Sequence, residues 1–166
     1  DAIFVCVGTP SDPKGHADLR YVMSAADDIA DVLKALGPKQ KPKIIVMKST
    51  VPVGTTFAMR DRIRAKVGPD VPFHVADNPE FLKEGDAVAD FLHPDRIVIG
   101  AEEDDEFAHD VMRRLYHPLS LNQDRLVFMA PASAELTKYV ANTMLAMRIS
   151  FMNEIAALRE SVGANI

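Results

Sequence analysis

Cysteine is almost absent from this chain: one is present among 166 residues, so no internal disulfide can form. A secretory or transit peptide is not visible, nor is an apolar run of membrane-spanning length. Together these absences favour the cytoplasm. The net charge of -5 gives no general attraction for nucleic acid or an anionic membrane, so a phosphate-bearing ligand would need a local site.

Metal-ligand patterns and the usual dinucleotide fingerprint are missing as well. The five histidines show no spacing typical of metal ligands, and one cysteine cannot build a cysteine zinc site, so no metal is predicted. The acidic run at 102–106 is typical of a solvated turn and helix start. No GxGxxG motif is present, so a dinucleotide domain formed by this chain would lack its first half. We therefore expect the chain to be a piece of a longer protein.

The sequence does contain a regular alternation of apolar runs and helical periodicity, in a composition of 48% apolar and 26% charged residues typical of globular domains. Continuous apolar runs that end at turn residues predict strands buried on both faces. The expected strands are 2–7, 43–48, 71–76, 96–99 and 125–129, and the expected helices are 18–36, 54–67, 79–91 and 104–116. This order predicts an α/β fold: the second half of a Rossmann-like, mostly parallel sheet flanked by helices.

A long helix is expected after the last strand, over residues 132–162, and Gly163 follows where helices often end in a left-handed cap. At about 1.5 Å per residue the helix spans roughly 45 Å, which is longer than the sheet. Between 139 and 152 it is apolar on nearly every side, so it needs partners beyond one sheet surface. We therefore divide the chain into a Rossmann-like part, 1–130, and a long central helix, 131–166.

Hydroxyl side chains follow the first two predicted strands. Thr9 stands between Gly8 and Pro10, and Thr50 ends the KST sequence after the second strand. Because the carboxyl ends of parallel strands form the edge where open α/β sheets bind ligands, Thr9 and Thr50 should lie side by side there and contact a cofactor or water. The alternative is that both residues are turn formers or helix caps.

Residues 78–85 (NPEFLKEG) contain two carboxylates four residues apart, Glu80 and Glu84. On the predicted helix the pair shares one face, where like charges cost about 0.2–0.5 kcal/mol. That cost is acceptable if one carboxylate is a base and the other a ligand contact. The alternative is that both merely favour a helix N-terminus through the helix dipole.

Three polar residues, Glu135, Lys138 and Asn142, form one stripe on the long helix among largely apolar neighbours. Such a stripe is costly unless something polar faces it. Lys138 and Asn142 aimed at one point could stabilise negative charge developing on an oxygen. The alternative is an ion pair between Glu135 and Lys138 within the helix, with Asn142 bonded to backbone across a subunit interface.

The single thiol, Cys6, falls inside the first predicted strand. Burial in apolar surroundings keeps a thiol protonated and inert. We therefore reject Cys6 as a catalytic nucleophile.

Four segments, 48–55 (KSTVPVGT), 78–85, 94–100 (PDRIVIG) and 133–142 (SAELTKYVAN), together resemble the UDP-glucose/GDP-mannose dehydrogenase family and are most like its UDP-glucose branch. The resemblance extends over essentially the whole chain. It implies an NAD-dependent enzyme that oxidises carbon six of UDP-glucose to the carboxylate of UDP-glucuronate, using two NAD in succession. The family's cysteine thiolate forms thiohemiacetal and thioester intermediates, and it belongs to a domain that this chain does not include.

The resemblance implies catalytic and cofactor roles for four of the residues above. Glu80 resembles the general base that activates water for thioester hydrolysis, and Thr50 resembles the residue that helps to place this water. Thr9, Thr50 and Glu84 resemble contacts to NAD.

The resemblance implies that Lys138 and Asn142 bind substrate and stabilise the tetrahedral oxyanion. The implied substrate-binding set is Glu80, Phe81, Leu82, Lys83, Glu84, Lys138 and Asn142. In the family the long helix joins two domains and forms a homodimer, which implies the same role for residues 131–166.

Two other functions remain open at this point. One is a related nucleotide-sugar dehydrogenase, acting on GDP-mannose or UDP-N-acetylmannosamine. The other is a noncatalytic module that dimerises through the long helix. Because the family's catalytic cysteine is not in this chain, we expect the chain alone to be inactive as a dehydrogenase.

Overall fold

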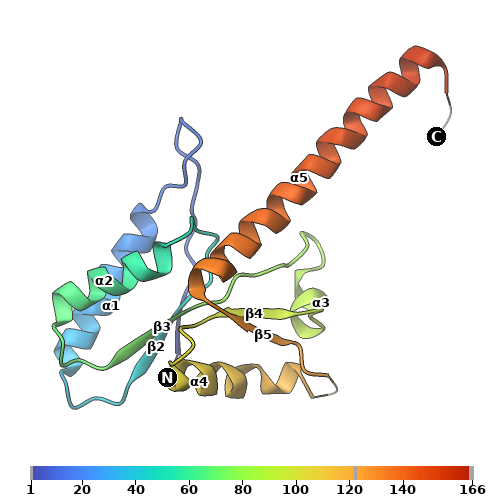
Figure 1. Ribbon diagram of the computed structural model, residues 1–166. Coiled ribbons are helices and arrows are strands. Elements are labelled where there is room, and N and C mark those ends of the chain that lie inside the picture. Colours follow the sequence, from blue (N-terminus) through green and yellow to red (C-terminus); the bar gives the residue numbers. More distant parts are fainter. Residues whose placement is uncertain (1, 122, 165–166) are drawn as a thin grey trace.

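A computed structural model describes residues 2–121 and 123–164, which form a five-stranded sheet with helices on both faces (Figure 1). The strands follow one another across the sheet in chain order, and every neighbouring pair is parallel except β3 and β4, which are antiparallel. The strands are β1 (Ala2–Val5), β2 (Lys43–Met47), β3 (Phe73–Asp77), β4 (Ile97–Gly100) and β5 (Leu126–Met129). The α/β, mostly parallel fold expected from the sequence is confirmed.

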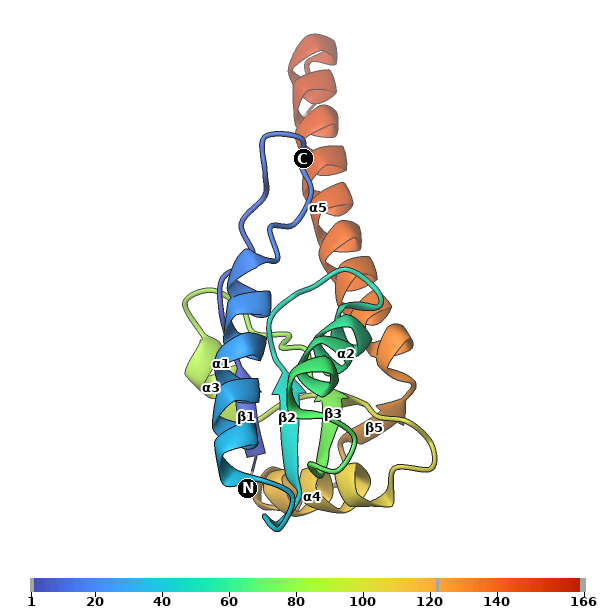
Figure 2. The same cartoon turned by 90° about the vertical axis from the view of Figure 1, so that its left-hand side faces the viewer.

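One face of the sheet is covered by α1 (Arg20–Leu36) and α2 (Thr55–Val67), which lie in front of the strands in Figure 2. Side chains alternate along a strand, so Ile45 and Met47 of β2 point into this core. Ile44 and Val46 point into the second core, on the opposite face. Because both faces of β2 are buried, its sequence from Ile44 to Met47 is a continuous apolar run.

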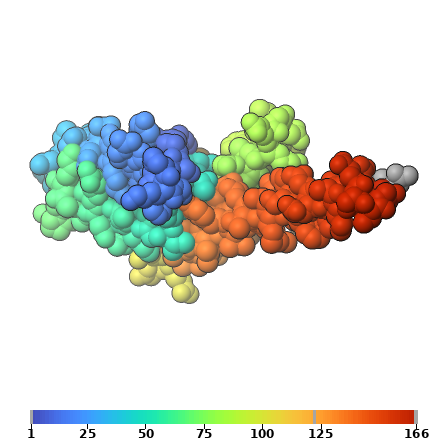
Figure 3. All heavy atoms as spheres, turned by 90° about the horizontal axis from the view of Figure 1, so that it is seen from above, coloured from blue at the N-terminus to red at the C-terminus, as the bar shows by residue number. Residues whose placement is uncertain are grey.

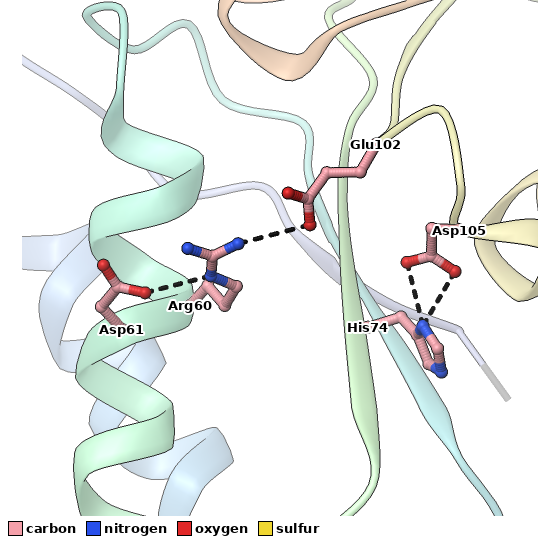
Figure 4. Close-up of polar contacts among 5 residues, drawn as sticks. All are labelled: Arg60, Asp61, His74, Glu102 and Asp105. Atoms are coloured by element: carbon pink, nitrogen blue, oxygen red, sulfur yellow. Dashed lines mark hydrogen bonds and ion pairs between the residues drawn. The ribbon is translucent and has the colours of Figure 1, made fainter.

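The opposite face is covered by α4 (Glu106–Tyr116), which is followed by a short 3-10 helix, η1 (His117–Leu119). Asp105 accepts a hydrogen bond from the Ala108 N–H at 2.9 Å and so caps α4. The same carboxylate lies 2.9 Å from the Nδ1 atom of His74 on β3 (Figure 4). This cap therefore also ties α4 to the sheet.

An ion pair at the surface joins α2 to the loop between β4 and α4. Arg60 of α2 points its Nη1 atom toward Glu102, which follows β4, and the N···O distance is 3.3 Å (Figure 4). Both side chains are partly exposed, so this ion pair contributes little to stability.

The last helix, α5 (Pro131–Val162), starts at the sheet and then extends well beyond the rest of the molecule (Figures 1 and 3). Its buried residues all lie in the first two turns: Pro131, Ala134, Glu135 and Lys138. It ends at Gly163 in the left-handed conformation (φ 68°), as predicted. Within the described residues, no helix is both long enough and apolar enough to cross a bilayer.

The helix predicted for 79–91 is wrong over most of its length. Residues 78–83 are irregular, a turn follows, and only α3 (Ala87–Leu92) is helical. Local side chains bind the backbone N–H groups that a helix would have used: Glu80 Oε2 accepts from the Leu82 N–H at 2.6 Å, and Asp90 Oδ2 accepts from the Lys83 N–H at 2.7 Å. Gly85 then reverses the chain with a φ of 88°.

The expected burial of Cys6 is also wrong. β1 ends at Val5, before the cysteine, and Cys6 is exposed. Because β1 is an edge strand of this sheet, fewer neighbours cover the residues that follow it than the apolar run suggested. The rejection of Cys6 as a nucleophile therefore cannot depend on burial.

Candidate functional site

Thr9 and Thr50 meet at the carboxyl edge of β1 and β2, as predicted. The Thr9 hydroxyl donates a hydrogen bond to the Thr50 carbonyl oxygen at 2.8 Å. Asn142 of α5 reaches the same place, and these three residues line an open hollow of about 410 Å³ together with Ser11 and Tyr139. We call it the Thr50 hollow.

Glu80 and Lys138, which are 58 positions apart in sequence, form an ion pair. The Nζ atom of Lys138 lies 3.0 Å from Glu80 Oε1, and the lysine side chain is only 7% exposed. The same ammonium lies 5.2 Å from the centre of the Phe81 ring. The first two turns of α5 therefore place a buried cation against the segment that follows β3.

The Glu80 carboxyl is held in its ionised form. Partial burial opposes ionisation, but the hydrogen bond from the Leu82 N–H and the Lys138 ammonium outweigh it and lower the pKa of Glu80 below its usual value. A carboxylate that is already deprotonated can accept a proton from a neighbouring group or water.

A second hollow, of about 420 Å³, lies beside Glu80, and we call it the Glu80 hollow. It is lined by residues of the segment after β3, including Phe81, Leu82 and Lys83, and by Lys48 and Tyr116. Burial lowers the pKa of Lys48 and raises the pKa of Tyr116 to about 12.

Asn78 organises the base of the Glu80 hollow. Its side-chain NH₂ donates to the Val98 carbonyl at 2.8 Å, and its Oδ1 atom accepts from Lys48 Nζ at 3.3 Å and from the Tyr116 hydroxyl. The asparagine is 1% exposed, and its bonds to Val98 and Tyr116 are buried away from bulk water. The residue after β2, the strand β4 and the helix α4 are thus all bonded to Asn78, at the start of the irregular segment 78–83.

Glu84 does not join this arrangement. It lies in the exposed turn before Gly85 and lines neither hollow, so the helical face that was to bring Glu80 and Glu84 together is wrong. Among the described residues, no group of three or more His, Cys, Asp or Glu side chains is arranged to hold a metal ion.

Glu135 was considered in the sequence only as a partner for Lys138, and that alternative is wrong. Its carboxylate instead accepts from the Gly54 N–H at 2.6 Å and from the Thr56 N–H and hydroxyl, both at 2.7 Å. These groups belong to the start of α2, whose own side chains provide no N-cap. A glutamate inside a long helix carries no sequence signal for such a contact, since the partner lies about 80 positions earlier.

Asp77, the last residue of β3, is a second buried carboxyl that sequence reasoning missed. It is 1% exposed, and its Oδ2 atom has no hydrogen-bond partner. Burial, and then the nearby Glu135, raise the pKa of Asp77 to about 8. Asp77 is therefore mostly protonated at neutral pH, unlike Glu80 three residues later.

Comparison with known protein families gives matches over nearly all of the chain. The profile of the UDP-glucose/GDP-mannose dehydrogenase family, NAD binding domain, matches residues 1–120. The profile of the same family's central domain matches residues 132–166. The first match confirms NAD as the cofactor implied by the sequence resemblance.

Individual relatives point to the same family. A UDP-glucose 6-dehydrogenase of Rhizobium meliloti is 49% identical over 167 residues, which cover 100% of this chain and 37% of the relative. The structure of a UDP-glucose dehydrogenase from the archaeon Pyrobaculum islandicum has a TM-score of 0.89 and 43% identity, over 99% of this chain and 36% of that one. A GDP-mannose dehydrogenase from Pseudomonas aeruginosa has a TM-score of 0.87 and 32% identity, over 99% and 37%. The chain thus spans a little more than a third of the length of these relatives.

The buried acid predicts a pH-dependent effect of Asp77→Asn on stability. The native state keeps a proton on Asp77 up to about pH 8, whereas the unfolded chain releases it near its usual value of 3.8, so wild-type stability falls as pH rises between these values. The substitution removes that loss, and its stabilising effect should grow by at most about 1.4 kcal/mol per pH unit across this window.

Urea unfolding of the protein at about pH 5 and about pH 8 measures this effect. Asp70→Asn, at an exposed aspartate, is the matched control and should show no such trend. A stability difference for Asp77→Asn that is the same at both pH values would contradict the assignment of a protonated Asp77.

Proposed function

The chain belongs to the UDP-glucose/GDP-mannose dehydrogenase family, and we propose that it forms part of an NAD-dependent UDP-glucose 6-dehydrogenase, contributing one side of the cofactor and sugar-nucleotide site. The observation that carries the proposal is the ion pair between Glu80 and Lys138, because it joins the segment after β3 to α5. Residues 1–130 would then belong to the NAD-binding part and 131–166 to the central helix. A cytoplasmic location, as expected for a chain with one cysteine, is part of the same proposal.

The Thr50 hollow fits part of a dinucleotide. The hydroxyl side chains of Thr9 and Thr50 and the Asn142 amide line it at the carboxyl ends of parallel strands, the edge where open α/β sheets bind such ligands. Bound NAD would supply the acceptor for the hydride that leaves carbon six of the sugar. Thr9 and Thr50 would bind and orient that cofactor. Glu84, exposed and outside both hollows, would reach it only through movement of the turn that carries it.

In this proposal Glu80 and Lys138 have different roles: Glu80 accepts a proton, and Lys138 stabilises negative charge. The Glu80 carboxylate accepts a proton from a water placed by Thr50, and the Lys138 ammonium stabilises negative charge on the substrate oxygen together with Asn142. While Lys138 is paired with Glu80 its charge weakens the base. A substrate oxygen that draws the ammonium away would strengthen Glu80 at the step that needs it.

Phe81, Leu82 and Lys83 would contact the uridine nucleotide sugar along an irregular stretch of backbone. Such a stretch presents amide groups that a helix would use internally. The higher identity to the archaeal UDP-glucose enzyme than to the GDP-mannose enzyme, 43% against 32%, supports UDP-glucose as the substrate.

A homodimer formed through α5 is a further part of the proposal. Large apolar side chains are exposed along the outer half of this helix: Met144, Leu145, Met147, Ile149, Phe151, Met152, Leu158 and Val162. A surface of this kind marks a protein contact.

The catalytic assignment predicts that Glu80→Gln in the full-length protein lowers kcat by about 10²- to 10⁴-fold, because the amide cannot take the proton. NADH absorbance with UDP-glucose and NAD measures the rate. Glu103→Gln, at an exposed glutamate, is the control and should keep the wild-type rate. Oxidation of GDP-mannose or UDP-N-acetylmannosamine instead would move the protein to another branch, and no oxidation of any of the three would favour a noncatalytic module.

The isolated chain should form no NADH from UDP-glucose and NAD. The family's catalytic thiol is not supplied by this chain: Cys6 is exposed but lines neither hollow. The measurement is the same absorbance assay, with the full-length protein as positive control. NADH formation by residues 1–166 alone would overturn this prediction.

The proposed dimer predicts that Phe151→Asp halves the mass of the full-length protein in solution, since a carboxylate would be buried in an apolar contact. Light scattering after size exclusion measures the mass. Asn153→Asp introduces the same charge at an exposed polar position and should leave the mass unchanged. A monomeric wild-type protein would rule the dimer out.

A further inference from the structure

Two parts of the proposed site come from segments that are far apart in sequence and must keep a fixed separation. Thr50 stands in the loop between β2 and α2, whereas Lys138 and Asn142 stand on α5. Glu135 is the side chain that binds both segments to each other. It is 2% exposed, and its two carboxylate oxygens accept three hydrogen bonds of 2.6–2.7 Å from Gly54 and Thr56.

We propose that Glu135 is the positioning residue of this site: its carboxylate fixes α5 against the start of α2 and so sets where Lys138 and Asn142 stand relative to Thr50. The proposal rests on the function proposed above. It assigns to Glu135 no contact with substrate or cofactor, only control over the residues that make those contacts.

The spacing along α5 supports this role. Lys138 follows Glu135 by three residues and Asn142 follows it by seven, so all three lie on one face of the helix, one and two turns apart. That face meets Gly54 and Thr56 through Glu135, Glu80 through Lys138, and the Thr50 hollow through Asn142. A rotation or slide of α5 at Glu135 would displace all of these contacts together.

The start of α2 gives the other half of the argument. Gly54, the N-cap, has a φ of 93° and no capping side chain of its own, and the Thr56 that follows is fully buried. Thr56 and Gly54 therefore depend on Glu135 as the acceptor for their N–H groups. Thr50 precedes Gly54 by four residues, so the bonds that cap α2 also hold the end of the Thr50 loop.

Apart from the hydrogen bonds of Glu135, which we call the Glu135 clasp, the first turn of α5 is held by close packing against β4. A Cβ atom on Gly100 of β4 would lie 2.8 Å from the Pro131 Cα atom and from the Ala134 Cβ atom, so the first turn of α5 rests directly on the strand. This contact sets the distance between α5 and the sheet but does not fix the orientation of the helix. The three hydrogen bonds of Glu135 fix that orientation, because hydrogen bonds are directional.

The test uses the full-length protein with Glu135→Asp and Glu135→Gln. The aspartate is one methylene shorter and cannot reach both donors from the present seat, and the glutamine turns an NH₂ group toward one of the N–H groups. We expect kcat to fall by about 10- to 100-fold in both, because Lys138 and Asn142 are displaced from the reacting oxygen. The change in KM should be much smaller, because the proposed nucleotide contacts of residues 81–83 remain. Glu103→Gln is again the control with unchanged kinetics.

A second readout separates positioning from a loss of folded protein. The charges that act on Glu80 are Lys138 from α5 and Lys48 from the end of β2. If α5 moves, Lys138 lowers the pKa of Glu80 less in the free enzyme, where the two are paired. The acid limb of the kcat/KM profile, which reports the free enzyme, then shifts to higher pH. A mere reduction in the amount of folded enzyme scales the whole profile and leaves its limbs in place.

A third readout does not depend on activity. Hydrogen exchange of the Gly54 and Thr56 amides should accelerate in both Glu135 variants. Faster exchange together with unchanged kcat and an unchanged acid limb would overturn the proposal. A wild-type protein that oxidises no nucleotide sugar would refute the proposed function instead. In that case, unchanged exchange of the Gly54 and Thr56 amides in the Glu135 variants would separately refute the role of Glu135 in holding α5 against α2.

Thr56→Val keeps the test decisive if the Glu135 variants do not fold, because it removes one donor and leaves the two N–H bonds. It should lower kcat by about threefold to tenfold and shift the acid limb in the same direction. Wild-type kinetics for a folded Thr56→Val together with unfolded Glu135 variants would mean that Glu135 is structural only.

Discussion

The attachment of α5 to the sheet depends on its first two turns, where the buried residues are Pro131, Ala134, Glu135 and Lys138. A helix of 32 residues spans about 48 Å, and most of that length lies outside the body of the protein. A small error in angle at the seat would therefore become a large displacement further along the helix. The two charged residues in these turns are both bonded to other segments, Glu135 to the start of α2 and Lys138 to Glu80. These bonds fix the orientation of the helix although its contact with the sheet is short.

Burial acts on several ionisable groups near this seat with different results, and the partner decides which form is kept. Glu80 has Lys138 and a backbone N–H, so it remains a carboxylate despite partial burial. Asp77, three residues earlier, has a carboxyl oxygen without a partner and lies near Glu135, so it keeps its proton. Lys48 is partly buried, and this lowers its pKa. The end of β3 and the segment after it are thus surrounded by an ionised carboxylate (Glu80), a protonated carboxyl (Asp77) and a lysine of lowered pKa (Lys48).

The architecture was predictable because it depends on patterns that are local in sequence. Strands buried on both faces leave continuous apolar runs, such as residues 43–47, and parallel order then places Thr9 beside Thr50 without knowledge of any side-chain contact. The family motifs named Glu80 and Lys138 in advance, and the structure brings them into contact. Each of these inferences required only the fold or a known sequence motif.

The remaining features depend on competition between side chains and backbone, which no periodicity reveals. The spacing of Glu80 and Glu84 suggested a helix, but carboxylates that bind nearby N–H groups favoured an irregular segment. Cys6 is exposed because β1 ends one residue before it at an edge of the sheet. The clasp of Glu135 joins positions 79 and 81 residues apart, so only the folded chain reveals it.

The irregular course of residues 78–83 is itself an argument about what this segment does. A helix would have satisfied its own amides and presented only side chains, with Glu80 and Glu84 on one face. The observed segment is instead held at its base by Asn78 and at Leu82 and Lys83 by single carboxylates, each exposed to competition from a ligand. Anionic or carbonyl groups of a nucleotide could replace these carboxylates at the same amides, since the acceptor chemistry is the same. Replacing Glu80 at the Leu82 amide would also release the carboxylate that the proposed mechanism needs as a base. Ligand recognition and activation of Glu80 would then be one event, and a helix in this place could not couple them.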